Sequence, residues 1–218
     1  MGCAMSDVDV VWLVSYPRSG NTFLRTILYQ CFGLYSASMY PKDIGGNQDL
    51  GLYIGHIEHG PDHRIRFPED AVPLVKTHEY DKDENPAIYV IRDGRAASVS
   101  MWKFYSKNIP LEAIIEGQHR FGTWADHLKS WNPWERPNTL LLEYESMRRD
   151  LLGTLKYISD FLKRDIKRDS IPERNAIAGV DGRWVKKYSN WRSEISDELL
   201  LKFNEINGDM LRIAGYLD

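Results

Sequence analysis

Apolar runs and helix-like patterns alternate along the chain. The first run, Val10–Val14, is rich in Val and too short to cross a membrane, which indicates a buried strand. A polar loop containing glycine follows, and apolar residues then recur at helical spacing at Leu24, Ile27, Leu28 and Cys31. Gly33 stands where helices commonly end on a left-handed residue. The beginning of the chain therefore predicts a strand, a loop and a helix.

The same alternation continues toward the C-terminus. Short apolar runs predict further strands over residues 71–79, 87–92 and 139–144. Helices are predicted after Arg92, within Pro110–Trp131, after Tyr144 and from Asp197, the last with Ser196 as its N-cap. Trp124, Leu128 and Trp131 share one helical face and are expected in the core. Alternating strands and helices predict an α/β fold: a central parallel sheet flanked by helices, with a ligand at the carboxyl ends of the strands.

The stretch from Tyr35 to Pro73 lacks this periodicity and is expected to be a long loop. Loops of this length in compact domains are commonly functional lids or disordered segments. The interspersed large side chains favour a mobile pocket wall: Tyr35, Met39, Tyr40, Tyr53, Ile54, His56, His59 and Phe67. Three histidines also lie here, at His56, His59 and His63. They do not predict a metal site, because no Cys or paired carboxylate lies at ligand spacing.

Composition limits the architecture and the partners. With 218 residues, 43% of them hydrophobic, the chain supports one sizeable core; we expect a flexible N-terminus over residues 1–8 and a single domain over residues 9–218. The net charge of −3 argues against nucleic acid as a partner, because nucleic-acid binders usually carry a basic surplus. No apolar run reaches the length of a membrane span.

The two cysteines, Cys3 and Cys31, cannot form a disulfide framework and fit a reducing compartment. The segment Met1–Ser6 matches the pattern for N-myristoylation, with Cys3 as a palmitoylation candidate. A match this short arises easily by accident, and Met5 offers an alternative start, so lipidation is not the favoured interpretation.

The loop after the first strand has the chemistry of an anion site. It opens onto a helix N-terminus, where unpaired backbone N–H groups and the helix dipole favour a negative group. Arg18 adds a full charge, and Ser19, Asn21 and Thr22 add donors, which favours phosphate or sulfate. A Walker loop would need Gly at Ser15 and Lys at Asn21, so an ordinary ATP- or GTP-hydrolysing site is disfavoured.

Two further pairs of residues suggest chemistry. Strand alternation places Lys76 and His78 on one face, so that a cation and a base point together, although a solvent-facing pair would have the same spacing. Arg92 closes the next strand and Ser100 lies about two turns into the following helix, so both can reach an anion held at that helix start. The alternative for Arg92 is a structural ion pair.

Together these motifs resemble the sulfotransferases that use 3′-phosphoadenosine 5′-phosphosulfate (PAPS). The family's 5′-phosphosulfate loop reads Tyr-Pro-Lys/Arg-Ser-Gly-Thr/Asn-Thr and then an aromatic residue, which Tyr16–Phe23 matches throughout. Lys76-Thr77-His78 and the Arg92 to Ser100 separation match two more of its motifs, in the same order. The resemblance covers nearly the whole chain and implies the P-loop-like fold of the cytosolic members. Secretory members usually have an N-terminal membrane helix, so a cytoplasmic location is expected.

The resemblance also implies roles for individual residues. The donor's 5′ end would be held by Arg18, Ser19, Gly20, Asn21, Thr22 and Phe23, its 3′-phosphate by Arg92 and Ser100, and its adenine near Tyr144. His78 would be the catalytic base, with Lys76 and Arg18 meeting the charge on the sulfuryl group and the leaving phosphate. The implied reaction transfers a sulfuryl group to a hydroxyl or amine of a small-molecule acceptor and leaves adenosine 3′,5′-bisphosphate (PAP), with no metal.

The resemblance weakens near the C-terminus, where the family has Arg-Lys-Gly followed by Gly-x-Trp. Gly179, Gly182 and Trp184 are in place, but Ile177 and Ala178 replace the two cations. Either other cations take over, from Arg174, Arg183, Lys186 and Lys187, or the 3′-phosphate is held more weakly. Two other functions stay open: a P-loop kinase or nucleotide hydrolase, and a non-catalytic PAP-binding relative.

Overall fold

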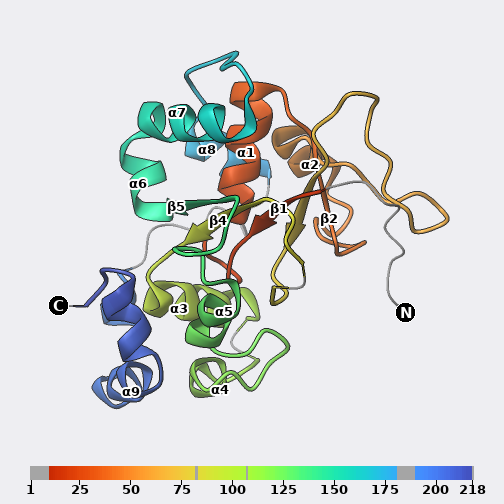
Figure 1. The fold of residues 1–218 in the computed structure, drawn as a ribbon. Coiled ribbons are helices and arrows are strands. Elements are labelled where there is room, and N and C mark those ends of the chain that lie inside the picture. Colours follow the sequence, from red (N-terminus) through yellow and green to blue (C-terminus); the bar gives the residue numbers. More distant parts are fainter. Residues whose placement is uncertain (1–9, 82, 107, 181–189, 218) are drawn as a thin grey trace.

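A computed structural model describes residues 10–81, 83–106, 108–180 and 190–217 (Figure 1). Its strands are β1 Val11–Val14, β2 Ser36–Ser38, β3 Leu74–Thr77, β4 Ala87–Ile91 and β5 Thr139–Glu143. The helices of the first half are α1 Asn21–Phe32, α2 Gln48–Ile54 and α3 Gly94–Phe104. Those of the second half are α4 Leu111–Ile115, α5 Trp124–Trp131, α6 Tyr144–Arg149, α7 Leu151–Leu162, α8 Arg174–Val180, the 3₁₀ helix η1 Trp191–Ser193 and α9 Asp197–Ile213.

The described strands form one parallel sheet in the order β2-β3-β1-β4-β5. This confirms the predicted α/β fold with a parallel sheet. After β1 the chain first builds one side of the sheet and then crosses to β4 on the other side, with Val11 beside Leu74 and Trp12 beside Ala87. Such a switch point, at the carboxyl ends of the strands, is where ligands bind in open α/β sheets. A ligand site is therefore expected at the carboxyl ends of β1, β3 and β4.

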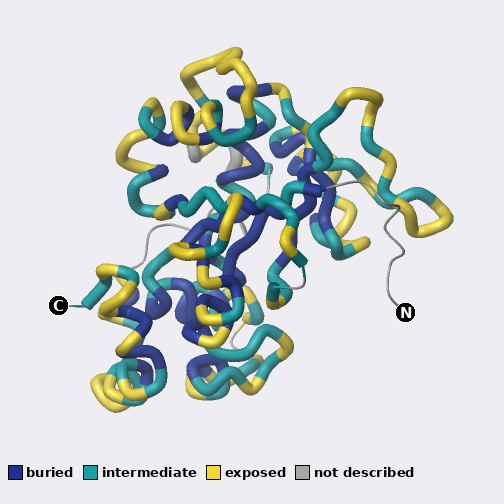
Figure 2. Tube along the Cα trace, in the orientation of Figure 1, coloured by how far each residue is buried: buried dark blue, intermediate teal, exposed yellow. Residues whose placement is uncertain are grey.

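The central strands are apolar because they are covered on both faces. Alternate residues of β1 face opposite sides: Trp12 and Val14 pack toward α3, α4, α5 and α9, whereas Leu13 packs toward α1, α6 and α7. Figures 1 and 2 show these two helical layers and the buried strands between them. Trp124, Leu128 and Trp131 are buried, as predicted. The strand at 139–144 was expected to be buried, but β5 is an edge strand in which Leu142 alone is buried.

Two predicted capping residues end or begin helices in the structure, as expected. Gly33 ends α1 in the left-handed conformation, at a φ of 70°, and its N–H bonds the carbonyl of Tyr29. Ser196 caps α9 by accepting a hydrogen bond from the N–H of Leu199 at 3.3 Å. Among the described residues, no helix is long and apolar enough to cross a membrane.

The prediction of one long loop from Tyr35 to Pro73 was wrong. This stretch contains β2 and α2, and β2 pairs in parallel with β3 at the edge of the sheet. β2 has only small residues, and α2 spans only seven, so neither element is long enough to show a hydrophobic period. Local polar bonds define α2 instead, since the side chain of its N-cap Asn47 accepts from the N–H of Leu50.

Candidate active site

A cavity of about 610 Å³ opens at the carboxyl ends of β1, β3 and β4. Its lining includes the predicted site residues with one exception, Ser19, which is buried beside it: Arg18, Gly20, Asn21, Thr22, Phe23, Lys76, His78, Arg92, Ser100 and Tyr144. Motifs far apart in the sequence therefore meet in one place. Aromatic side chains complete the wall, at Tyr40, Phe104, Tyr105 and Phe121.

The β1–α1 loop leaves a helix start open toward this cavity. Arg18 and Gly20 adopt positive φ values of 67° and 112°, and Gly20 precedes α1 without any side-chain cap. The first N–H groups of α1 are therefore available to a ligand. The side-chain amide of Asn21 donates to the carbonyl of Leu13 at 2.8 Å. Asn21 was expected to add a side-chain donor to an anion, but its side chain braces the loop against β1.

Position 20 requires a glycine for two reasons: its positive φ and the lack of space for a side chain. A Cβ at this position would lie 2.5 Å from Cδ2 of Tyr144, whose ring closes over the loop. The Tyr144 ring also makes an edge contact with Phe23, at 6.2 Å between centroids, and lies 4.7 Å below the guanidinium of Arg92. The loop, the end of β4 and the start of α6 thus build one surface.

The β4–α3 turn differs from its sequence-based prediction. The anion was expected at the start of α3, but Asp93 caps this helix by accepting from the N–H of Arg95 at 2.9 Å, and its carboxylate also pairs with the Arg95 guanidinium. A carboxylate therefore occupies the place of the expected ligand. Arg92 instead donates to the carbonyl of Arg18 at 2.9 Å, and Arg18 Nε donates to Ser100 Oγ at 3.3 Å. The second motif joins the first rather than forming a separate site.

Two buried donors around this junction fit an anionic ligand. Ser19 Oγ and Arg92 Nε are buried without a hydrogen-bond partner among the described residues. Buried donors are rarely left without a partner in folded proteins. A phosphate or sulfate oxygen is a suitable acceptor for both groups.

His78 is held as a neutral base. Its Nδ1 lies 2.6 Å from the carbonyl oxygen of Ser15, which can only accept, so Nδ1 carries the hydrogen and Nε2 keeps the lone pair. Burial, followed by the charge of Lys76, holds the pKa of His78 well below its ordinary value. His127 donates from Nε2 to the His78 carbonyl at 3.1 Å, and the Tyr40 ring stacks on the imidazole at 6.0 Å. β3 ends at Thr77, but Lys76 and His78 both reach the cavity.

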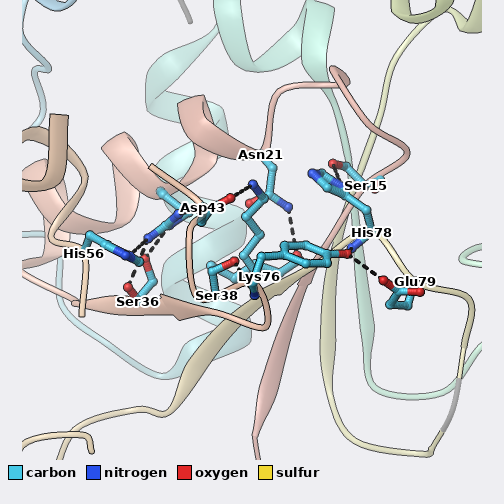
Figure 3. A network of polar contacts seen from close by, with 12 residues as sticks. Ser15, Asn21, Ser36, Ser38, Asp43, His56, Lys76, His78 and Glu79 are labelled. Atoms are coloured by element: carbon cyan, nitrogen blue, oxygen red, sulfur yellow. Dashed lines mark hydrogen bonds and ion pairs between the residues drawn. The ribbon is translucent and has the colours of Figure 1, made fainter. Parts of the chain in front are cut away.

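Lys76 has a partner that the sequence did not reveal. Its ammonium forms an ion pair with Asp43 (Figure 3). The Asp43 carboxylate also pairs with Arg25 at 2.7 Å. Lys76 and Arg25 hold the pKa of the Asp43 carboxyl well below its usual range, although burial alone would raise it. Asp43 lines the cavity but lies in the stretch interpreted as a loop, and no spacing rule relates it to Lys76.

The expected pocket wall from the Tyr35 to Pro73 stretch is largely wrong. Tyr40 lines the cavity, as expected, but the other residues named for the wall do not: Tyr35, Met39, Tyr53, Ile54, His56, His59 and Phe67. Tyr35 packs against Tyr29, at 5.1 Å between ring centroids, and Ile54 belongs to a small separate core. These apolar side chains stabilise β2 and α2 and the adjoining chain, which the sequence pattern had not revealed.

Other candidates either have structural partners or fall outside the described chain. His56 Nδ1 accepts from Arg25 Nη2 at 2.7 Å, and no group of three potential metal ligands occurs in the described parts of the chain. The segment with Gly182, Arg183, Trp184, Lys186 and Lys187 is outside the described residues, as are Cys3 and the side chains of Arg174, Ile177 and Ala178. Which cations replace the family's Arg-Lys pair therefore stays a prediction.

Known proteins provide independent comparisons. The sulfotransferase domain family matches residues 8–198. Sulfotransferase 2A1 of Rattus norvegicus is 28% identical over 190 residues, which cover 77% of this chain and 63% of the relative. Sulfotransferase 2A2 of the same organism is 32% identical over 218 residues, covering 88% of this chain and 72% of the relative. The chain thus spans less than two thirds of the length of the first of these relatives.

The fold is also shared with a solved structure. The crystal structure of mouse sulfotransferase SULT7A1 complexed with PAP aligns with a TM-score of 0.63 at 20% identity. The alignment covers 94% of this chain and 84% of the mouse chain. At this identity the comparison supports the fold of the sheet and its helices.

Proposed function

This chain belongs to the sulfotransferase domain family, and we propose that it transfers the sulfuryl group of PAPS to a hydroxyl or amine of a small-molecule acceptor, releasing PAP. The observation that carries the proposal is the meeting of an open helix start, several cations and a neutral histidine in one cavity. Arg18 and Lys76 are the cations assigned to the reacting group, and His78 is the base.

The cavity suits both ends of the donor. The first N–H groups of α1, with Arg18 and Ser19, would hold the 5′-phosphosulfate, which carries the reacting group. Arg92 and Ser100 would contact the 3′-phosphate, and the rings of Tyr144 and Phe23 offer a surface for the adenine. The buried donor groups of Ser19 and Arg92 support this placement.

The reaction follows from these positions. His78 Nε2 removes the proton of the acceptor hydroxyl or amine while the acceptor atom forms a bond to sulfur. In line with this attack the bond between sulfur and the bridging oxygen breaks, and the electron pair stays on the phosphate of PAP. Arg18 and Lys76 stabilise the charge that develops on the sulfuryl and phosphate oxygens. Fixed cations placed in this way remove the need for a catalytic metal ion.

The other two functions have less support. A kinase or hydrolase of the P-loop type needs a lysine at the position of Asn21, whose side chain here is bonded to the Leu13 carbonyl. A binding-only relative would have no use for a lysine and a neutral histidine at the same cavity. Lys76 and His78 both line it, so an enzyme is the better proposal.

We also place the protein in the cytoplasm. Cys31 is a free, buried thiol, which is typical of proteins kept in a reducing compartment.

Transfer of radiolabelled sulfate from PAPS to a panel of hydroxyl and amine acceptors, with a metal chelator present, tests the proposal. His78→Ala should lose about 10²–10⁴-fold in rate, the usual contribution of a general base, with PAP affinity nearly unchanged by calorimetry. His63→Ala, which removes an exposed histidine outside the cavity, is the matched control and should retain full activity. Loss of PAP binding together with the rate would contradict the role of His78, and chelator-sensitive phosphate transfer from ATP would contradict the whole proposal.

A further inference from the structure

Three charged side chains from distant parts of the chain meet at the wall of the cavity, which Asp43 and Lys76 line. Arg25 comes from α1. Asp43 comes from the segment between β2 and α2, and Lys76 from β3 (Figure 3). Their side chains are 1%, 5% and 4% exposed. Oδ2 of Asp43 accepts from Arg25 Nη1 at 2.7 Å, and Oδ1 accepts from the ammonium of Lys76. One carboxylate therefore bridges two buried cations.

The guanidinium of Arg25 is also held by hydrogen bonds to groups other than Asp43. Its Nε donates to Ser36 Oγ at 2.8 Å, and its Nη2 donates to the Ser36 carbonyl at 3.1 Å and to His56 Nδ1 at 2.7 Å. The guanidinium is thus bonded to Ser36 of β2 and to His56, two residues beyond the end of α2. A carboxylate bonded to such a fixed group has little freedom to turn, so the position of Asp43 is set by the fold.

We propose that Asp43 is a positioning residue of the active site: held by Arg25, it keeps Lys76 charged and directed at the cavity. The proposal rests on the proposed function, in which Lys76 stabilises the transferring sulfuryl group. Only Lys76 of this cluster would touch the reacting atoms, and Asp43 acts through it.

The charges around Lys76 support this role. Burial lowers the pKa of the Lys76 ammonium, and the cations Arg25 and Arg18 act in the same direction, whereas Asp43 opposes them. The two nearby histidines add no charge, since burial and then Arg25 lower the pKa of His56 to about 4, and the pKa of His78 is also lowered. Without Asp43 the ammonium would lie in a buried site near other cations. Both conditions favour the neutral amine and would lower the pKa of Lys76 further.

The pH dependence of kcat in Asp43→Asn tests the proposal. This change keeps the size of the side chain and removes its charge. The pKa of Lys76 should then fall further, so the rate on the alkaline side of the profile should fall by about 10²–10³-fold, the effect of losing one preorganised donor, with a smaller loss on the acidic side. Asp43→Glu retains the carboxylate and should keep the wild-type profile. A wild-type profile in Asp43→Asn would overturn the proposal.

A double variant separates charge from structure. A guanidinium does not deprotonate in this range, so Lys76→Arg in the Asp43→Asn background should abolish the added pH dependence, measured against Lys76→Arg alone. An added pH dependence that persists in the double variant would show that Asp43 does not act through the charge of Lys76. Binding of PAP by calorimetry identifies variants that have lost their fold.

The wild-type protein provides a test that needs no stable Asp43 variant. A carbon NMR titration of labelled lysine, with the Lys76 signal assigned by its absence in Lys76→Arg, should show a charged ammonium at neutral pH. A neutral Lys76 at neutral pH would overturn the proposal. The titration reports this charge whether or not sulfuryl transfer occurs, so it can fail independently of the proposed function.

Discussion

The two junctions at which a central strand passes into a helix have similar sequence patterns and opposite structures. At the β1–α1 junction, Gly20 precedes the helix without a side-chain cap, and the helix start is open. At the β4–α3 junction, Asp93 precedes the helix and its carboxylate accepts from the N–H of Arg95. One helix start is available to an anion, and the other is closed by the protein's own carboxylate.

The difference shows which residue decides the chemistry of such a junction. An apolar run, a polar turn and a helix predict the backbone, but the residue just before the helix determines whether the N–H groups remain free. At the first junction the backbone and side chains would hold the ligand together. At the second the N–H groups are closed off, and the ligand would be held by the side chains of Arg92 and Ser100, which line the cavity together with other residues of α3.

The largest effect is expected from closing the open junction. Gly20→Ala places a Cβ 2.5 Å from the Tyr144 ring at a φ of 112°. Backbone strain of about 1–3 kcal/mol adds to displacement of that ring, so PAP affinity should fall about a hundredfold or more by calorimetry. Gly46→Ala is the control, since it has a similarly positive φ of 77°, nothing lies within 4 Å of a Cβ there, and it is not part of the cavity lining. Unchanged affinity in Gly20→Ala would mean that the ligand does not use this helix start.

A smaller and selective effect is expected at the second junction. Arg92→Ala should weaken the binding of PAP by about 1.5–3 kcal/mol, the value of a charge-assisted contact, and should hardly change the binding of adenosine 5′-phosphate. Ser100→Ala should act in the same sense but less, because it removes a neutral hydroxyl. Arg92 also bonds the Arg18 carbonyl, so Arg92→Lys serves as the control that keeps the charge. If the affinity for both nucleotides fell equally, Arg92 would act by holding the β1–α1 loop rather than by binding the 3′-phosphate.

Opening the closed junction should affect stability more than binding. Asp93→Ala removes the cap of α3, a loss of about 0.5–2 kcal/mol in the free energy of unfolding, and leaves buried Arg95 without its ion pair. PAP affinity should change by less than about 0.5 kcal/mol. Ser196→Ala, which removes the cap of α9 without breaking an ion pair, should cost less in urea unfolding. A collapse of PAP affinity in Asp93→Ala would show that the start of α3 does contribute to the site.

The smallest effect concerns pH and depends on the burial of His78 beside the first junction. A free histidine would be half protonated near pH 6.5, but burial and Lys76 lower the pKa of His78. Its base form should therefore persist as the pH falls through 6.5, and kcat/KM should decline only at lower pH. The measurement is the acid limb of kcat/KM, with acceptors that do not titrate in this range. A midpoint at the ordinary histidine value would show that His78 is not held neutral.

The sequence predicted the parts of the site that depend on local order. The central strands are near-continuous apolar runs, and the motif around Arg18 is defined within a few residues, so both could be recognised. The Asp93 cap was recognisable too, as an Asp before a helical pattern, but the anion expected at that position obscured it. Asp43 could not be found, because its partners Arg25 and Lys76 are 18 and 33 positions away and meet it only in the folded chain.

The central claim is that an open first junction and a charged second junction together bind a nucleotide with phosphates at both ends of its ribose. Calorimetry of the wild-type protein with PAP and with adenosine 5′-phosphate tests it most directly. We predict that PAP binds tighter by about 1.5–3 kcal/mol, or roughly 10–150-fold, without added metal. Equal affinity for the two nucleotides, or tighter binding of ATP with magnesium, would contradict the account.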